Sequence, residues 1–473
     1  SATQKLNHLQ DLGINMIQLM PIFEFAADFS RGYNPALPFA VESAYGTPYD
    51  LMHFIDEAHE RGIGVMTDVV HNHWGPSDLP MWQFDGPGFG DPPADGGIYF
   101  YNDWRAETPW GHTRPDYGRS KVREYIYDNT FFLLDQYRMD GLRWDSTGNI
   151  YANDYGRGTP IPDGRDMLKW INGAVNQTQG WKPMIAEDFA QGDWVTQSLD
   201  DDGLGFDTQW SGGFVHPIRD VVIPADDGDR NMWMVQDAIH QNYNGRAFNR
   251  VIYTESHDEN ANGRARLPEE IYPGNVGSYW ARKRSTLAAA LLMATPGIPM
   301  LFQGQEVLED EWFRDTDPVD WSRKQTYSGI YNMYRDMVHL RRNWYNNTRG
   351  LQGENTNVYH VNDGANVIVF HRWDQGGQGD DVVIMANFSN TEFPEYWVGF
   401  PRGGTWYSVF NSDSSKYGDD FDNFGLSSIE ANGGAMDGLN HSANAPIGRY
   451  SLVMYSQRQN PQPADNSDTF VIY

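Results

Sequence analysis

The first 300 residues of the chain repeat one pattern of a helical stretch, a glycine-containing turn and a short β-branched run that ends in polar residues. Residues 3–12 are predicted to form a helix that stops at Gly13, and the strand 15–21 follows. Residues 49–60 and 64–70 repeat the same order. Such alternation is typical of parallel β/α folds, in which each helix returns the chain to the starting edge of the sheet.

Seven strands of this kind can be placed along the chain. Their predicted ranges are 15–21, 64–70, 141–145, 184–188, 205–209, 251–256 and 298–303. A closed (β/α)8 barrel needs eight parallel strands. We therefore predict an α/β fold whose main domain, residues 1–350, is a (β/α)8 TIM barrel with one strand absent from its expected place.

Two further regions differ from this pattern. Residues 71–120 are rich in glycine, proline, tryptophan and aspartate and have no regular period, so they are predicted to be a loop-rich insertion after the third barrel strand. Between residues 351 and 457 the apolar residues recur with a period of two, which predicts a C-terminal antiparallel β-sandwich domain. Residues 458–473 begin as a polar, proline-bearing linker and end in TFVIY.

The charge balance excludes several kinds of partner. The 473 residues include 35 Lys and Arg and 64 Asp and Glu, which gives a formal net charge of −29. Such a surface repels phosphate backbones and anionic membranes, so we expect no nucleic-acid or membrane partner. The most apolar stretch, residues 287–302, is interrupted by prolines and is too short to span a bilayer. We expect a soluble protein, cytoplasmic or secreted, and the oligomeric state stays open.

Residue types narrow the chemistry further. The chain has no cysteine, which excludes disulfides, thiolate metal sites and cysteine nucleophiles. Aromatic residues make up 14% of the chain, with 17 Trp and 26 Tyr, more than a core needs. Flat apolar rings with polar edges suit the faces of sugar rings, and a sugar would be a neutral substrate compatible with the negative surface.

Four of the predicted strands end in polar residues. The segments are DVVHNH (68–73), DGLRWD (140–145), MIAED (184–188) and YTESHDE (253–259). In a parallel barrel the chemistry is found at the carboxyl ends of the strands. These ends supply three carboxylates and three basic side chains, namely Asp145, Glu187, Asp258, His73, His257 and Arg143.

Paired carboxylates are what cleavage of a glycosidic bond requires. One carboxylate attacks or stabilises the oxocarbenium-like carbon, and a second, protonated one donates a proton to the leaving oxygen. Arg143 lies two residues before Asp145 and so on the same strand face, where it is predicted to keep that carboxylate ionised with a lowered pKa. Glu187, if less charge-compensated, would keep a raised pKa and act as the acid.

The four segments, in this order, resemble the signature regions of the α-amylase superfamily of glycoside hydrolases, glycoside hydrolase family 13. Gly32-Tyr33, AYGTPYDL (44–51) and GIPMLFQGQE (297–306) extend the resemblance over nearly the whole chain. The resemblance implies that Asp145 is the nucleophile, Glu187 the general acid/base and Asp258 the stabiliser of the transition state. It also implies four residues that line the subsite of the distorted sugar ring, namely Tyr33, His73, Arg143 and His257.

Within the superfamily, AED (186–188), ESHD (255–258) and residues 100–118 look closer to glycogen and starch branching enzymes than to secreted α-amylases. Two positions depart from that group, because Asn72 and Glu259 stand where branching enzymes usually carry Ser and Gln. The first hypothesis is therefore a retaining hydrolase of α-1,4-glucosidic bonds in starch- or glycogen-type glucans. The alternative is a 1,4-α-glucan branching enzyme that forms α-1,6 branches by transglycosylation, and a non-catalytic glucan-binding protein is the third hypothesis.

A metal role is implied at one position only. Asn72 would be a calcium ligand in many α-amylases, but Gly148-Asn149 follow Asp145 where those enzymes have Lys-His. The alternative for Asn72 is an amide that structures its loop. A zinc pair of His71 and His73 is rejected, since no third ligand follows at suitable spacing. The chemistry itself requires no cofactor, and structural calcium stays an expectation.

The insertion contains four tryptophans, Trp74, Trp82, Trp104 and Trp110, each of which is either a sugar platform or part of a small local core. Trp144 is predicted to face away from Arg143 and to pack against the helical layer. The last residues, SDTFVIY (467–473), resemble the first barrel strand of the family. One hypothesis is that these residues are that first strand, displaced by a circular permutation or by joining of pieces out of native order. The other hypothesis is that they are the start of another domain.

Overall fold

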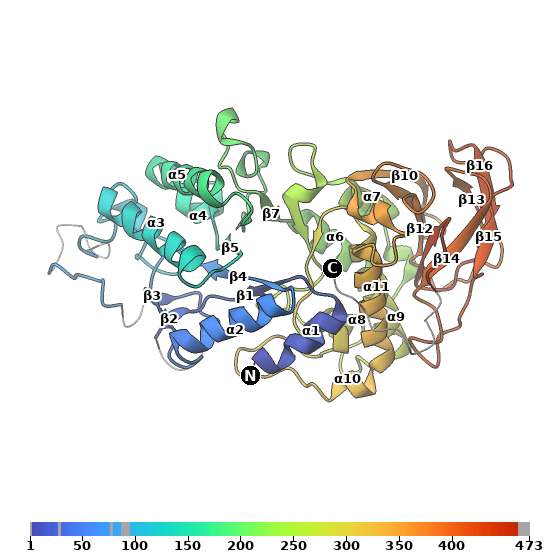
Figure 1. Cartoon of the computed structure of the whole chain (residues 1–473), viewed down its shortest axis with the longest axis horizontal. Coiled ribbons are helices and arrows are strands. Elements are labelled where there is room, and N and C mark those ends of the chain that lie inside the picture. Colours follow the sequence, from blue (N-terminus) through green and yellow to red (C-terminus); the bar gives the residue numbers. More distant parts are fainter. Residues whose placement is uncertain (1, 27–29, 76–78, 87–94, 462–473) are drawn as a thin grey trace. The chain divides into compact units, whose positions relative to one another are not determined.

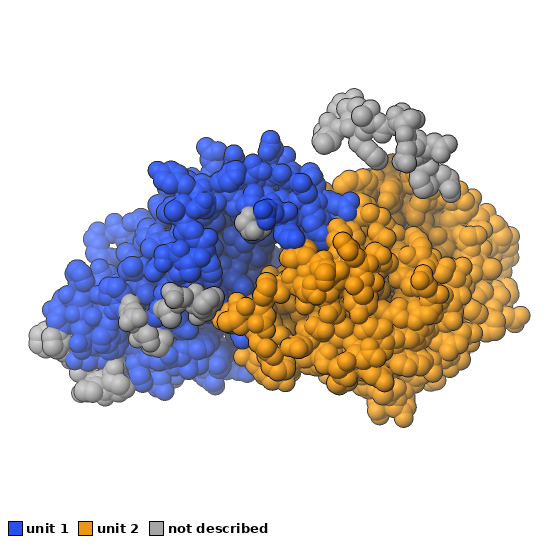
Figure 2. Space-filling model, turned by 90° about the horizontal axis from the view of Figure 1, so that it is seen from below, with its two compact units in different colours: residues 1–212, 242–251 blue, residues 213–241, 252–473 orange. Residues whose placement is uncertain are grey.

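The computed structural model describes residues 2–26, 30–75, 79–86 and 95–461. These residues form two compact units (Figure 2). Unit 1 comprises residues 1–212 and 242–251, and unit 2 comprises residues 213–241 and 252–473. The expected first barrel strand at 467–473 lies outside the described residues and stays a prediction.

A parallel sheet organises unit 1 (Figure 1). Its strands are β1 (Met16–Leu19), β4 (Gly64–Val69), β5 (Gly141–Trp144), β6 (Met184–Ala186), β7 (Thr208–Trp210) and β8 (Arg250–Ile252), each paired in parallel with the next. The last residue of β8 belongs to unit 2, where the Met300 amide after β9 (Ile298–Pro299) donates to the Ile252 carbonyl over 2.9 Å. All seven strands overlap their predicted ranges, which confirms the β/α fold class, but β7 begins at Thr208 and not at 205, and β9 ends at Pro299 and not at 303.

Local signals set the helix ends of unit 1. The helix α1 (Leu6–Leu12) ends at Gly13, whose φ of +91° is a conformation that glycine adopts readily. The helix α2 (Pro48–Glu60) begins with a capping box, in which Thr47 and Asp50 each accept the other's backbone N–H. The other elements of unit 1 are η1 (Ala2–Lys5), η2 (Trp104–Ala106), α3 (Ser120–Asp135), α4 (Gly148–Tyr151), η3 (Asp154–Gly156), α5 (Pro162–Gln179), η4 (Asp193–Val195), η5 (Leu199–Asp201) and η7 (Ala247–Asn249).

One element of unit 1 was not expected. The strands β2 (Phe23–Phe25) and β3 (Pro35–Val41) form an antiparallel pair between the first strand and the second helix of the sequence pattern. Their register shifts twice, β2 has only three residues, and β3 contains two prolines and no polar residue, so neither strand shows a clear alternation. The pair matters because Tyr33 and Asn34 lie just before β3.

Helices predominate in the first part of unit 2. They are α6 (Gly212–Val222), η6 (Asp227–Asp229), α7 (Met232–His240), α8 (Leu267–Ile271), α9 (Tyr279–Ala294), η8 (Gln305–Val307), α10 (Arg323–Thr326), α11 (Ser328–Arg341) and η9 (Arg349–Gln352). The helix α9 is buried from Lys283 to Ala294, which explains its apolar, alanine-rich sequence. Among the described residues, no helix is both long and apolar enough to cross a membrane.

The C-terminal part of unit 2 is an antiparallel β domain, as predicted. One sheet has six strands in the order β10 (Asn355–Asn362), β11 (Val367–Trp373), β12 (Val382–Asn387), β17 (Ser451–Ser456), β14 (Thr405–Asn411) and β15 (Ser428–Glu430). A second sheet pairs β13 (Trp397–Phe400) with β16 (His441–Asn444). Side chains of both sheets, such as Val383, Met385, Val398 and Phe400, share one buried core, which makes the domain a sandwich. The strands β15 and β16 are short and were not predicted.

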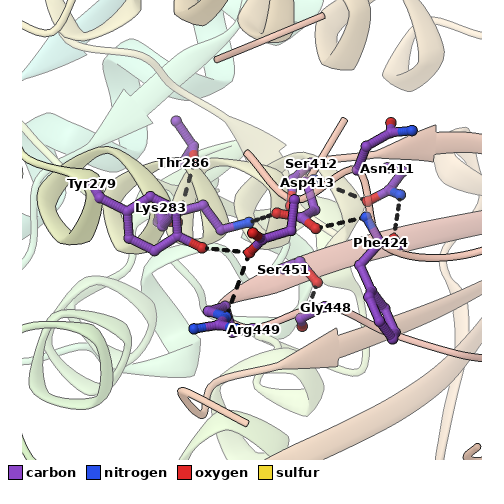
Figure 3. Close-up of polar contacts among 12 residues, drawn as sticks. Tyr279, Lys283, Thr286, Asn411, Ser412, Asp413, Phe424, Gly448, Arg449 and Ser451 are labelled. Carbon is purple, nitrogen blue, oxygen red and sulfur yellow. Dashed lines mark hydrogen bonds and ion pairs between the residues drawn. The ribbon is translucent and has the colours of Figure 1, made fainter. Parts of the chain in front are cut away.

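A buried ion pair joins α9 to this β domain (Figure 3). Lys283 of α9 pairs with Asp413, which follows β14, and the two side chains are 1% and 0% exposed. The other oxygen of Asp413 accepts the Phe424 N–H over 2.9 Å. Burial lowers the pKa of Lys283, and the neighbouring Asp413 charge opposes this shift. Both charges are therefore compensated mainly by each other.

We predict that Lys283→Met destabilises the protein by about 3–5 kcal/mol, since removal of one partner leaves the Asp413 carboxylate buried without its counter-charge. Denaturant unfolding of the purified variant measures this loss. The double variant Lys283→Met/Asp413→Asn is expected to recover part of it, because the uncompensated charge is then removed as well. A loss below about 1 kcal/mol in the single variant would contradict the prediction.

Candidate active site

A single guanidinium holds three carboxylates together inside unit 1. The Nη1 atom of Arg143 lies 2.7 Å from Asp68 Oδ2 and 2.9 Å from Asp145 Oδ1, and its Nη2 atom lies 2.7 Å from Glu187 Oε1. The side chains of Arg143 and Asp68 are fully buried, and those of Asp145 and Glu187 are 10% and 8% exposed. One cation facing three carboxylates gives this cluster an excess of negative charge.

The strand register explains why these residues meet. Asp68 of β4 is the direct partner of Arg143 of β5 in the parallel ladder. One step further along the strands, the Asp145 amide donates to the Val69 carbonyl over 3.0 Å and the Glu187 amide donates to the Trp144 carbonyl over 2.9 Å. The carboxyl ends of β4, β5 and β6 therefore bring the two predicted carboxylates of unit 1 together, as the sequence suggested.

Asp68 belongs to the cluster but was not among the site residues predicted from the sequence. Its Oδ2 atom accepts the Tyr33 hydroxyl over 2.6 Å, and its Oδ1 atom accepts the Gln18 amide over 2.7 Å. Burial raises the pKa of Asp68 to about 6, and the Arg143 charge opposes that shift. The only signal in the sequence was a charged residue within the apolar strand DVV, and its pairing with Arg143 is seen only in the structure.

The pKa of Arg143 is raised, as expected for a cation among three carboxylates. Burial is the largest single influence and lowers it, but the charges of Asp68 and Glu187, followed by those of Tyr33 and Asp145, together raise the pKa well above its ordinary value. The Trp210 ring of β7, which the sequence argument also left out, lies with its centroid 4.4 Å from the Arg143 guanidinium carbon. Arg143 is therefore a permanent cation.

Arg143 contacts both predicted carboxylates. Arg143 and Asn72 both contact Asp145, since the Asn72 amide donates to Asp145 Oδ2 over 2.8 Å. The Nη2 atom of Arg143 lies 2.7 Å from Glu187 Oε1, and the raised pKa of Glu187, predicted on the condition that Glu187 is less charge-compensated, stays a prediction. Glu187 differs in its second partner, because its Oε2 atom accepts the Ser146 backbone N–H over 3.0 Å.

Asn72 and His73 continue the cluster after β4. The Oδ1 atom of Asn72 lies 2.6 Å from His73 Nδ1, and His73 Nε2 lies 3.0 Å from Asn34 Oδ1. Burial, followed by the charge of Arg114, lowers the pKa of His73 to about 3, so the ring is neutral at physiological pH. His73 and Tyr33 therefore lie beside the carboxylates, and their predicted role in binding the sugar ring stays a prediction.

The contacts of Asn72 match those of a loop-structuring amide. Both ends of its side chain are engaged by Asp145 and His73. Within the part of the chain that the structure describes, no group of three or more His, Asp and Glu side chains comes together in a way that could hold a metal ion. Calcium ligation by Asn72 stays a prediction.

The residue after Glu187 fixes its backbone. The Tyr151 hydroxyl donates to Asp188 Oδ2 over 2.7 Å, and the backbone amides of Ala190 and Gln191 donate to Asp188 Oδ1 over 3.0 Å each. The Thr147 hydroxyl donates to the Glu187 carbonyl over 2.8 Å. These contacts hold the end of β6, and thus the direction in which Glu187 leaves the strand.

The other two predicted residues belong to unit 2, in the segment that follows β8. His257 is buried, and its Nε2 atom lies 3.4 Å from Asp258 Oδ2. The Asp258 side chain is 44% exposed. The backbone amides of Asp258 and Glu259 donate to the Ser256 hydroxyl over 3.2 and 3.0 Å. The participation of His257 and Asp258 in the same site as Asp145 stays a prediction.

The tryptophans of the insertion divide between the two roles. Trp74 is fully buried in the unit 1 core, and Trp82 packs against it. Trp104 and Trp110 are 50% and 38% exposed. Trp144 is fully buried in the same core, as expected from its position opposite Arg143. Trp104 and Trp110 are thus the more exposed of the four tryptophans.

The raised pKa of Asp68 predicts a specific pH dependence of stability. The folded state takes up a proton at Asp68 near pH 6, whereas an unfolded aspartate does so near pH 4, so the stabilisation from this proton is present at low pH and is lost as the pH rises through about 6. Relative to Asp68→Asn, the free energy of unfolding of the parent should fall by about 2–3 kcal/mol between pH 4 and pH 7. Denaturant titrations at four pH values measure it, and a pH-independent difference would contradict the prediction.

Comparison with known proteins identifies the family. Residues 2–82 match the catalytic domain of alpha amylase, and residues 359–458 match the alpha amylase C-terminal all-beta domain. The 1,4-alpha-glucan branching enzyme GlgB of Thermobifida fusca is 30% identical over 447 residues, which cover 88% of this chain and 56% of that protein. The proteins of the same name from Corynebacterium efficiens and Corynebacterium diphtheriae are 29% and 28% identical over 88% and 96% of this chain.

These matches define the class of protein as the α-amylase superfamily, glycoside hydrolase family 13. The relatives within that superfamily that match 88–96% of this chain are named 1,4-alpha-glucan branching enzymes. The chain spans 56%, 57% and 62% of the length of the three relatives named above.

Proposed function

We propose that the protein is a 1,4-α-glucan branching enzyme, which cleaves an α-1,4 bond of a glucan and transfers the released chain to a 6-hydroxyl. The observation that carries the proposal is the similarity to proteins of that name over 88–96% of this chain. Hydrolysis, the first hypothesis from the sequence, has support at the level of the family alone. The substrate under both hypotheses is an α-glucan.

The proposed reaction begins at Asp145 and Glu187. The Asp145 carboxylate attacks the anomeric carbon while a protonated Glu187 donates its proton to the leaving 4-oxygen, which breaks the α-1,4 bond and leaves a glycosyl ester on Asp145. Arg143 and the Asn72 amide keep Asp145 ionised and oriented before the attack. The close approach of Arg143 Nη2 to Glu187 favours the carboxylate that Glu187 becomes after it has donated the proton.

The second half of the reaction reverses these roles. The ionised Glu187 removes the proton from an incoming 6-hydroxyl, whose oxygen attacks the anomeric carbon and displaces Asp145. The result is an α-1,6 bond with the original anomeric configuration. We assign stabilisation of the transition state to Asp258. The subsite of the reacting sugar is assigned to four residues, namely Tyr33, His73, Arg143 and His257.

Hydrolysis is the second candidate function. It uses the same carboxylates, and water takes the place of the 6-hydroxyl, so the two reactions differ in the acceptor site and in water exclusion. Asn72 and Glu259 favour this candidate, because they depart from the usual branching-enzyme residues. Incubation with amylose separates the outcomes: branching lowers the iodine colour without new reducing ends, hydrolysis raises reducing ends, and a non-catalytic glucan-binding protein changes neither but is retarded in an amylose gel.

A further inference from the structure

A row of aromatic rings lies beside the carboxylates of unit 1. The Trp110 ring stacks on His73 with centroids 4.7 Å apart and an interplanar angle of 19°. Tyr155 meets Trp110 edge to face at 6.1 Å, and Phe189 meets Tyr155 in the same way at 5.4 Å. Trp110 and Phe189 are 38% and 42% exposed. We call Trp110, Tyr155 and Phe189 the aromatic row.

Both ends of the row connect to the catalytic cluster. His73, on which Trp110 stacks, is linked through Asn72 to Asp145. Phe189 follows Glu187 by two residues in the sequence. The row is therefore continuous with the proposed site of bond cleavage.

The middle of the row is held in an unfavourable backbone conformation. Tyr155 has φ 53° and ψ 37°, and its neighbours Asp154 and Gly156 also have positive φ values of 48° and 88°. For a bulky aromatic residue this left-handed conformation is uncommon and costs free energy, and such residues are frequently found where a ligand is held. The conformation places the Tyr155 ring between Trp110 and Phe189.

A chain of hydrogen bonds connects this strained turn to Glu187. The Tyr155 amide donates to Asn149 Oδ1 over 3.2 Å, and Asn149 Nδ2 donates to the Ser146 hydroxyl over 2.9 Å. The Ser146 amide in turn donates to Glu187 Oε2 over 3.0 Å. The position of the Tyr155 ring is thus coupled to that of the proposed acid/base.

We propose that the aromatic row binds glucose units of the α-glucan chain outside the pair of units joined by the reacting bond. This inference rests on the proposed function and assigns it a binding surface. Glucose rings offer C–H faces that cover aromatic rings, and they carry no charge, which suits a chain with a net charge of −29. The exposed Arg157 guanidinium donates to the Phe189 carbonyl over 2.8 Å and places further N–H donors next to the row for sugar hydroxyls.

The test is the affinity for maltoheptaose and for maltotriose, measured by calorimetry in the Asp145→Asn background so that the sugars are not consumed. Phe189→Leu is expected to weaken maltoheptaose binding about tenfold, and maltotriose binding by a smaller factor, because the longer sugar has more glucose units beyond the pair joined by the reacting bond. Phe189→Tyr keeps an aromatic ring and is expected to restore the affinity. Trp104→Ala removes an exposed tryptophan of the same insertion outside the row and is the matched control.

Two results would overturn the inference. One is equal maltoheptaose affinity of Phe189→Leu, Trp110→Ala and the parent, with melting temperatures that show all three to be folded. The other is an equal loss of affinity in Trp104→Ala. The proposed function is tested separately, in the amylose assay with the chain that retains Asp145. If that chain forms no branches, the proposed function fails, but the affinities for maltoheptaose and maltotriose can still be measured.

Discussion

Asp145→Asn is expected to reduce the rate of glucan transfer by about a thousandfold or more, because the amide cannot form the glycosyl ester that both halves of the proposed reaction share. Glu187→Gln is expected to have an effect of similar size, since it removes the proton donor of the first half and the base of the second. Initial rates on amylose, followed by iodine colour and reducing ends, measure both losses.

Because each of these two substitutions changes only a carboxylate to an amide, a matched control variant can test whether they affect folding. Asp202→Asn makes the same chemical change at a 75% exposed side chain of unit 1 and is expected to leave the rate unaltered. Melting temperatures of all three variants show whether a loss of rate reflects a loss of structure. Retention of even a tenth of the parental rate by Asp145→Asn or Glu187→Gln would overturn the assignment.

Arg143→Lys is expected to lower the rate by about a hundredfold or more, although it preserves the charge. The two terminal nitrogens of Arg143 contact Asp68, Asp145 and Glu187 at once, and a single ammonium cannot reproduce that planar arrangement. With weaker compensation, the carboxylates should bind protons more readily. The acid limb of the pH–rate profile should therefore move to higher pH.

The measurement is kcat/KM on amylose between pH 4 and pH 9. Arg119→Lys, at the surface of unit 1 where Arg119 pairs with Asp116, is the matched control and is expected to keep the parental profile. An unchanged rate and an unchanged acid limb in Arg143→Lys would show that the guanidinium does not organise the carboxylates.

The fold could be predicted from the sequence where local chemistry decides it. Gly13 ends a helix because its positive φ suits glycine, and the strand ends at Asp145 and Glu187 follow from apolar runs that stop at polar residues. The β2–β3 pair escaped prediction because β2 has only three residues and β3 contains two prolines and no polar residue, so no period of two is visible. The strands β15 and β16, of three and four residues, are too short to show a period.

The parts of the candidate site that depend on contacts between residues far apart in the chain were harder to predict from the sequence. Asp68 and Arg143 are 75 residues apart, and only the pairing of β4 with β5 shows that they share an ion pair. The sharing of Arg143 between Asp145 and Glu187 likewise depends on strand geometry, so the sequence left open how far the charge of each carboxylate is compensated. The aromatic row joins residues of the insertion, of η3 and of the segment after β6, and it has no sequence motif.

The central claim is that this chain transfers α-glucan segments to 6-hydroxyls. Proton NMR of the product formed from linear amylose measures it most directly, because the anomeric protons of α-1,4 and α-1,6 linkages give separate signals. We expect α-1,6 signals to grow while the α-1,4 signals decrease by the same amount and reducing-end signals stay constant. Growth of the reducing-end signals without any α-1,6 signal would contradict the claim and show hydrolysis instead.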